Sequence, residues 1–244
     1  MKIISKDTLD STNSFAEQLL SNGLITQPCC ITAKYQTSGK GRGSNTWNSE
    51  SGKNLILSII CFPHFLPAEK QFYLNKAVAL SVSELITELS VGNNVTIKWP
   101  NDVYAGNKKI AGILIQTAIQ NNTIKHAIIG IGVNINQEVF PAELPNATSV
   151  IEYTATETNI DHALERYLVL FEKYYNFLKD GMLSKIDGRY IESLYRFGKH
   201  SAFLYENKKI FARISGVNEY GWLQIVTEDG KTLCGDMNKI KMIL

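Results

Sequence analysis

The chain has 244 residues, of which 44% are hydrophobic and 20% charged, a composition that supports a buried core and excludes disorder along its whole length. Its 25 basic and 23 acidic residues give a net charge of +2, which argues against a nucleic-acid-binding protein held mainly by bulk charge. No apolar run reaches the roughly 20 residues of a membrane-spanning helix, and the first residues lack a signal-peptide core, so we expect a cytoplasmic protein.

Strand and helix patterns follow one another over the first 197 residues. The apolar patterns predict strands at 2–7, 30–35, 54–62, 96–99, 108–119 and 125–135, with Asn121-Asn122 as the turn between the last two. Helices are predicted at 11–22, 69–90, 161–179 and 184–197. Between two of the strands, residues 36–52 form a long glycine-rich loop, and loops of that length inside a compact domain are usually functional or disordered.

The pattern of predicted elements changes near residue 197. From His200 onward the segments are short, rich in β-forming residues and separated by polar turn signals, a pattern that suggests a small barrel. We therefore predict two domains, 1–197 and 198–244. Because the second is too small to bury a core of its own, it should pack against the first.

The first segment whose residues suit a binding or catalytic role is Gly39-Lys40-Gly41-Arg42-Gly43, inside the long loop. Alternating glycines allow a close backbone approach, and successive N–H groups in such a turn bind anions. The two cationic side chains add charge that suits phosphate oxygens. The segment is neither a P-loop nor a dinucleotide fingerprint. A solvated linker remains the alternative.

Two further segments lie at strand ends. In Lys98-Trp99-Pro100-Asn101-Asp102, Pro100 stops the strand and presents Asn101 and Asp102, which suit either a metal–triphosphate or an Asx turn.

In Lys108-Lys109-Ile110-Ala111-Gly112 the side chains alternate, so one ammonium points to each face of the strand. An inward lysine is costly unless it meets an anion. The alternative is a solvent-exposed hairpin edge, where the lysines prevent pairing with another strand. Further on, Gly130 and Gly132 close a buried strand and allow another group to approach, and Asn134 offers both a donor and an acceptor.

The order of these segments resembles the biotin protein ligase family. The matching segments are Ser11-Thr12-Asn13, Tyr35-Gln36 followed by Gly39-Lys40-Gly41-Arg42 and Trp47, Lys98-Trp99-Pro100-Asn101-Asp102, Lys109-Ile110-Ala111-Gly112 and Gly130-Ile131-Gly132-Val133-Asn134. The match begins at residue 11, so we expect the short, monofunctional form without an N-terminal helix-turn-helix.

The resemblance implies an α/β catalytic domain with a mixed sheet, related to class II aminoacyl-tRNA synthetases and lipoate ligases, and then an SH3-like β-barrel domain. It implies that biotin and ATP form biotinyl-5′-adenylate, with release of pyrophosphate. The biotinyl group then passes to one lysine of the carrier domain of a biotin-dependent carboxylase. Mg²⁺ is expected on the phosphates, with Asp102 as a possible ligand. No DNA or membrane partner is expected, and a monomer and a homodimer both stay open.

The resemblance also implies roles for individual residues. Biotin would contact Ser11, Thr12, Asn13, Gln36, Gly39, Gly41, Arg42, Lys109 and Gly112. The nucleotide would contact Lys40, Arg42, Trp47, Asn101, Asp102, Lys109 and Asn134. Lys109, Arg42 and Lys40 would be catalytic, with Lys109 bridging the carboxylate and the α-phosphate.

The loop departs from the family pattern. Gly43 and Ser44 stand where members usually carry an arginine and a glycine, and Asn45 stands where a basic residue is common. One phosphate contact would then be missing, or made by Lys40, Lys53 or Mg²⁺. Two alternatives to biotin ligation are a lipoate or octanoate ligase or transferase and a nucleic-acid-binding regulator. The near-neutral charge and the missing DNA-binding helix disfavour the second.

Overall fold

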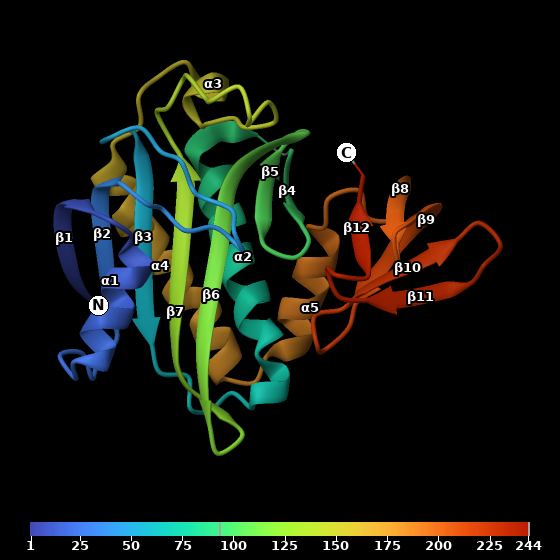
Figure 1. Cartoon of the computed structure of the whole chain (residues 1–244), viewed down its shortest axis with the longest axis horizontal. Helices are drawn as coiled ribbons and strands as arrows, with labels where there is room; N and C mark the ends of the chain where they lie inside the picture. Colours follow the sequence, from blue (N-terminus) through green and yellow to red (C-terminus); the bar gives the residue numbers. More distant parts are fainter. Residues whose placement is uncertain (93, 244) are drawn as a thin grey trace.

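The computed structural model describes residues 1–92 and 94–243, and a seven-stranded mixed sheet forms its centre (Figure 1). β1 and β2 are parallel, and the other neighbouring pairs are antiparallel. In spatial order the strands are β1 (Lys2–Leu9), β2 (Cys29–Gln36), β3 (Asn54–Cys61), β7 (Thr123–Asn134), β6 (Lys108–Gln120), β5 (Asp102–Ala105) and β4 (Val95–Lys98).

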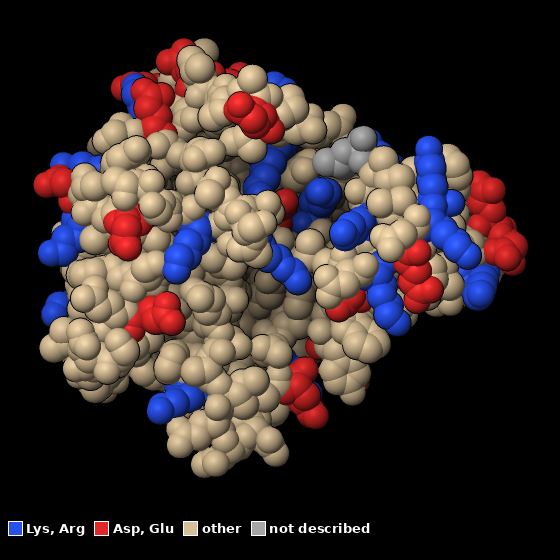
Figure 2. All heavy atoms as spheres, in the orientation of Figure 1, with Lys and Arg blue, Asp and Glu red and all other residues tan. Residues whose placement is uncertain are grey.

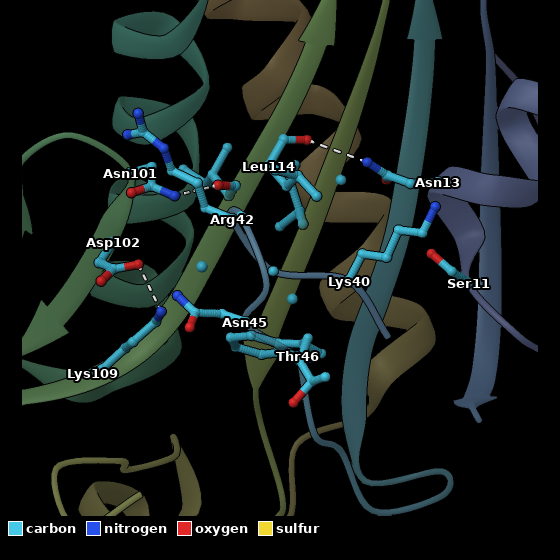
Figure 3. A pocket seen from close by; sticks show the side chains of 18 of the residues that line it. Ser11, Asn13, Lys40, Arg42, Asn45, Thr46, Asn101, Asp102, Lys109 and Leu114 are labelled. Atoms are coloured by element: carbon cyan, nitrogen blue, oxygen red, sulfur yellow. Dashed lines mark hydrogen bonds and ion pairs between the residues drawn. The ribbon is translucent and has the colours of Figure 1, made fainter. Parts of the chain in front are cut away.

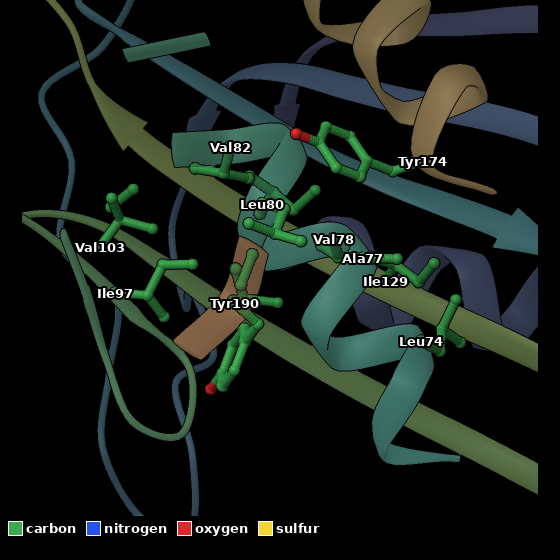
Figure 4. Packing of buried hydrophobic residues seen from close by; sticks show 14 of the residues in the cluster. Leu74, Ala77, Val78, Leu80, Val82, Ile97, Val103, Ile129, Tyr174 and Tyr190 are labelled. Carbon is green, nitrogen blue, oxygen red and sulfur yellow. The ribbon is translucent and has the colours of Figure 1, made fainter. Parts of the chain in front are cut away.

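Helices cover both faces of this sheet. The large core lies between the sheet and the back helices α2 (Phe72–Ile86), α4 (Ile160–Lys179) and α5 (Leu183–Glu192), as Figures 1 and 4 show. α1 (Thr12–Ser21) packs on the opposite face over a smaller apolar cluster that includes Ala16, Ile60 and Ile128. Every residue of β3 is buried, which agrees with its continuous apolar run. None of the helices in the described residues is long and apolar enough to cross a membrane.

The predicted elements are mostly present, with two differences at their ends. α2 ends at Ile86, and a π-helical turn at Thr87–Val91 replaces the end of the predicted helix. The helix predicted to reach residue 197 ends at Glu192, because the next residues run beside β4 and exchange backbone hydrogen bonds with Ile97. β5 and the single-turn helix α3 (Ile151–Thr154) were not predicted.

The C-terminal residues form a separate antiparallel sheet in the order β11-β10-β9-β8-β12. Phe203, Ile214 and Ile225 of this sheet belong to the same core cluster as the central sheet, so the predicted packing against the first domain is confirmed. No ladder between β11 and β12 closes the sheet within residues 94–243, so the expected barrel is not confirmed. The strands are β8 (His200–Tyr205), β9 (Lys208–Val217), β10 (Leu223–Thr227), β11 (Thr232–Gly235) and β12 (Ile240–Met242).

Candidate functional site

A hollow in the front face of the sheet is created by glycines in register. In one row, Gly112 of β6 and Gly132 of β7 lie side by side, with Asp102 and Ile56 as their outer neighbours. Two residues along the strands, Gly130 lies between Ser58 and Leu114. The missing side chains leave room above the sheet for a cavity of about 320 Å³ (Figure 3).

Trp47 packs into the space that two of these glycines leave. A Cβ on Gly132 would lie 2.5 Å from Trp47 Nε1, and one on Gly112 would lie 3.0 Å from Trp47 Cζ3. The loop that carries Trp47 is folded into a small hairpin, in which Gly41 N donates to Asn45 O and Trp47 N donates to Gly39 O. Gly43 has a left-handed φ of +65° in the turn of that hairpin, which explains a glycine at this position. The glycine-rich segment is therefore an ordered wall of the cavity in this structure.

The N-terminus of α1 supplies the polar end of the cavity. Ser11, Thr12 and Asn13 are almost completely buried there. The backbone N–H and the hydroxyl of Thr12 both donate to Gln36 Oε1, at 2.8 and 3.1 Å. Ser58 on β3 lies behind them, within hydrogen-bond distance of Thr12 and Asn13. These groups give the cavity several fixed donors and acceptors at one end.

Cationic side chains surround the rest of the cavity. Lys40, Arg42, Lys109 and Lys241 line it together with one carboxylate, Asp102. Figure 2 shows basic side chains gathered around the hollow on this face. In Figure 3 the Lys40 ammonium points toward the end with Ser11 and Asn13, and Arg42 points toward Asn101. The site therefore carries a local positive charge that suits an anionic ligand, although the chain as a whole is nearly neutral.

Lys109 forms an ion pair with Asp102, with Nζ 2.7 Å from Oδ1, and its side chain is 36% exposed. Its neighbour Lys108 points the other way and pairs with Glu152, so the predicted alternation is confirmed. Lys98 lies beside this pair on β4. Burial lowers the pKa of Lys98, the charge of Asp102 opposes that shift, and the charge of Lys109 adds to it.

A second cavity of about 240 Å³ adjoins the first. It shares Thr46, Trp47 and Lys109 with the first cavity, and Phe140, Leu144 and Pro145 give it an apolar side. Asn134 lines it, and the buried Oδ1 of that residue has no hydrogen-bond partner within the described chain. Lys109 is the cation that the two cavities share.

The structure brings twelve of the fourteen predicted site residues into the lining of the first cavity. Asn134 instead lines the second cavity, and Gly39 lies outside the lining of the first, at a position where an added Cβ would meet Gln36 and Trp47. Asn101 lines the first cavity and also ties the strand end to β6, since its Nδ2 donates to Ile113 O at 2.7 Å.

Sequence reasoning missed several lining residues. Gly130 and Gly132 carried a signal, because glycines alternate there in a buried strand, but they were not assigned to the site. No local signal marks the three residues of the C-terminal segment that line the cavity, Met237, Asn238 and Lys241. Arg42 contacts the sulfur of Met237, which lies in the turn between β11 and β12, so the loop and this turn meet at the cavity that both residues line.

Comparisons with known proteins agree with this geometry. Residues 6–134 match the biotin/lipoate A/B protein ligase family. The chain is 30% identical to the bifunctional ligase/repressor BirA of Bacillus subtilis, over 93% of this chain and 70% of that protein. It is 30% identical to the biotin–[acetyl-CoA-carboxylase] ligase of Mycobacterium tuberculosis, over 58% of this chain and 52% of that protein. The biotin protein ligase from Aquifex aeolicus, solved in complex with biotin and ATP, superposes with a TM-score of 0.82 at 27% identity, covering 99% of this chain and 98% of that one.

Proposed function

Because the chain belongs to the biotin/lipoate A/B protein ligase family, we propose that it is an ATP-dependent biotin–protein ligase. It forms biotinyl-5′-adenylate from biotin and ATP, and then transfers the biotinyl group to a lysine of a carboxylase carrier domain. The observation that carries this proposal is the place of Lys109, a cation in the wall between a polar cavity and an adjoining, partly apolar one.

The two cavities fit the two substrates in different ways. A neutral ureido ring needs matched donors and acceptors, which Ser11, Thr12 and Gln36 supply at the far end of the first cavity. A nucleobase needs apolar contact and a few hydrogen bonds, which the second cavity supplies through Trp47 and the free Oδ1 of Asn134. The reacting carboxylate and α-phosphate would then meet at Lys109.

The first reaction brings two anions together. A carboxylate oxygen of biotin attacks the α-phosphorus, the bond to the bridging oxygen breaks, and pyrophosphate leaves. The protein has little covalent chemistry to do, so positioning and charge neutralisation account for most of the acceleration. In this proposal the new bond forms beside Lys109, and Lys40 and Arg42 lie on the loop above the cavity, so these three are the proposed catalytic residues.

The loop at 36–49 has a second role in this proposal. An acyl adenylate hydrolyses readily, so the site must exclude water while the intermediate waits for its acceptor. We propose that ligand contacts stabilise this loop over the bound adenylate. The contact of Arg42 on this loop with Met237, in the turn between β11 and β12, supports this proposal.

The donor set around the cavity indicates how Mg²⁺ would bind. Asp102 is the one carboxylate among the residues that line the first cavity, and it already pairs with Lys109. The described residues hold no cluster of three or more His, Cys, Asp or Glu side chains suited to a metal. Mg²⁺ commonly keeps several waters and binds through substrate phosphates, so we propose that it arrives on ATP with Asp102 as its protein contact.

In the second reaction the acceptor amine attacks the acyl carbon and AMP leaves. A free lysine titrates near 10.4, and the positive charges around the cavity would lower the pKa of an incoming amine. The acceptor is proposed to be a carrier domain of a biotin-dependent carboxylase, as the name of the Mycobacterium tuberculosis relative indicates for that protein.

Several finer assignments belong to the same proposal. We keep the division into 1–197 and 198–244, an SH3-like character for the C-terminal sheet and a cytoplasmic location as predictions. The family includes lipoate ligases, so a lipoate or octanoate substrate is the alternative.

The experiment that tests the function is ATP–pyrophosphate exchange with purified protein. We expect exchange that depends on biotin and is not supported by lipoate or octanoate. Exchange with lipoate alone would reassign the substrate, and no exchange with either acid would contradict the proposed function.

A further inference from the structure

We propose that Asn13 is a positioning residue that braces the N-terminus of α1 and donates no hydrogen bond to the substrate, and that Gln116 and Ser58 hold it in place. This inference rests on the proposed function, because its readout is the use of biotin. It also differs from the role that the family resemblance implies for Asn13, which is direct contact with the ring.

The first step is the hydrogen-bond inventory of the Asn13 side chain. Its Nδ2 donates to Gln116 Oε1 at 3.0 Å and to Leu114 O at 3.5 Å. Its Oδ1 accepts from the Ser58 hydroxyl at 2.6 Å. An asparagine amide has two N–H donors, and both are used within the protein. The amide therefore has no donor left for a ligand.

The orientation of this amide is fixed by its surroundings. The carbonyl oxygen of Leu114 can only accept, so the NH₂ group must face β6 and the oxygen must face Ser58. Gly130 allows the arrangement, because it lies between Ser58 and Leu114 in the sheet. A Cβ there would lie 2.9 Å from Asn13 Cγ. Asn13 thus spans three strands, and only a glycine leaves it room.

The consequence falls on Thr12, the next residue in the chain. The single hydroxyl proton of Ser58 goes to Asn13 Oδ1, which cannot donate, so Thr12 Oγ1 receives no proton from Ser58 although it lies 2.8 Å away. The hydroxyl proton of Thr12 goes to Gln36 Oε1 at 3.1 Å or to Ser58 Oγ. The lone pairs of Thr12 Oγ1 are then free to accept an N–H of the ureido ring. The brace fixes both the position of Thr12 and its role as an acceptor.

The sharpest test uses Gln116, which is exposed and lies outside the lining of the first cavity. Gln116→Leu removes the acceptor for Asn13 and should raise the KM for biotin about tenfold in pyrophosphate exchange, with the KM for ATP and kcat nearly unchanged. Gln116→Glu keeps an acceptor oxygen and should restore the KM. Gln120→Leu, an exposed glutamine on the same strand, is the matched control and should leave the KM unchanged.

Ser58 has its own control. Ser58→Ala should also raise the KM for biotin about tenfold. Ser81→Ala removes an equally buried hydroxyl from α2, where it donates to Val78 O, and should change thermal stability without changing the KM. A merely structural role for Ser58 would give both variants the same kinetic profile.

A double-mutant cycle completes the test. If Gln116 acts through Asn13, then Asn13→Ala and Gln116→Leu together should raise the KM for biotin no further than Asn13→Ala alone. Additive effects, or a Gln116→Leu variant that behaves like Gln120→Leu, would overturn the inference while wild-type exchange with biotin still supports the function. Absence of biotin-dependent exchange in the wild type would instead contradict the proposed function.

Discussion

The packing of Trp47 against Gly112 and Gly132 allows a quantitative prediction. An added Cβ at Gly132 would lie 2.5 Å from Trp47 Nε1, whereas ordinary contacts begin at 3.4 Å, so the indole must move by about 1 Å. Gly132 has no left-handed backbone, so Gly132→Ala tests this contact alone. Overpacking of this kind costs about 1–3 kcal/mol.

Trp47 lines both cavities, so the displaced ring should weaken the binding of both substrates. Since a factor of ten corresponds to about 1.4 kcal/mol, we expect Gly132→Ala to raise the KM for biotin and for ATP by about 5- to 100-fold. Gly112→Ala, with its nearest Trp47 atom at 3.0 Å, should have a smaller effect.

Gly188 provides a control at which alanine should raise the stability of the fold. It lies in α5, and a Cβ there would meet nothing within 4 Å. Gly188→Ala should therefore stabilise the fold by about 0.5–1 kcal/mol and leave both KM values unchanged. The assays are thermal unfolding and pyrophosphate exchange on all three variants. A Gly132→Ala protein with wild-type stability and wild-type KM values would refute the reasoning.

Three other outcomes follow from the contacts. Lys109→Met should lower adenylate formation by about 10²- to 10³-fold in pyrophosphate exchange without unfolding the protein. Lys108→Met is the control and should keep the wild-type rate. Equal rates for the two variants would show that Lys109 is not catalytic. Burial alone would raise the pKa of Glu84, but its hydrogen bonds and ion pair outweigh burial and hold the pKa below its ordinary value. Glu84→Gln should therefore lower the free energy of unfolding by about 1 kcal/mol at pH 7. This difference from the wild type should vanish as the pH falls through the lowered pKa of Glu84. A difference in unfolding free energy that stays constant at acidic pH would contradict this. Trp99→Phe removes the indole donor to Gly221 O at 2.9 Å and should lower the Tm by about 2–4 °C; an unchanged Tm would show that this bond contributes no stability.

The sequence predicted most of the central sheet because its strands are marked by local patterns. A continuous apolar run marked β3, which is buried along its whole length, and the Asn121-Asn122 signal marked the hairpin between β6 and β7. β5 was missed because it has four residues, begins directly after the turn at Pro100 and is defined by its pairing with β4 and β6. Such pairing depends on the rest of the sheet, which a local pattern does not contain.

The residues of the candidate site also divide into those marked by a local pattern and those brought in by distant parts of the chain. Lys40, Arg42 and Lys109 drew attention because their neighbouring glycines and lysines form local motifs, and their roles came from the resemblance that the order of these motifs shows to the biotin protein ligase family. Met237 and Lys241 were missed because they reach the cavity through the packing of a second sheet, and nothing within a few residues of them indicates that contact. Figure 1 shows why, since the C-terminal sheet lies beside the central one, far along the chain from the loop that it meets.

The most direct test of the central claim is the mass of a biotin carboxyl carrier domain after incubation with this protein, biotin and Mg·ATP. The account predicts the addition of one biotinyl group to one lysine, and loss of that product with Lys109→Met. A carrier of unchanged mass, or equal product with Lys109→Met, would contradict it.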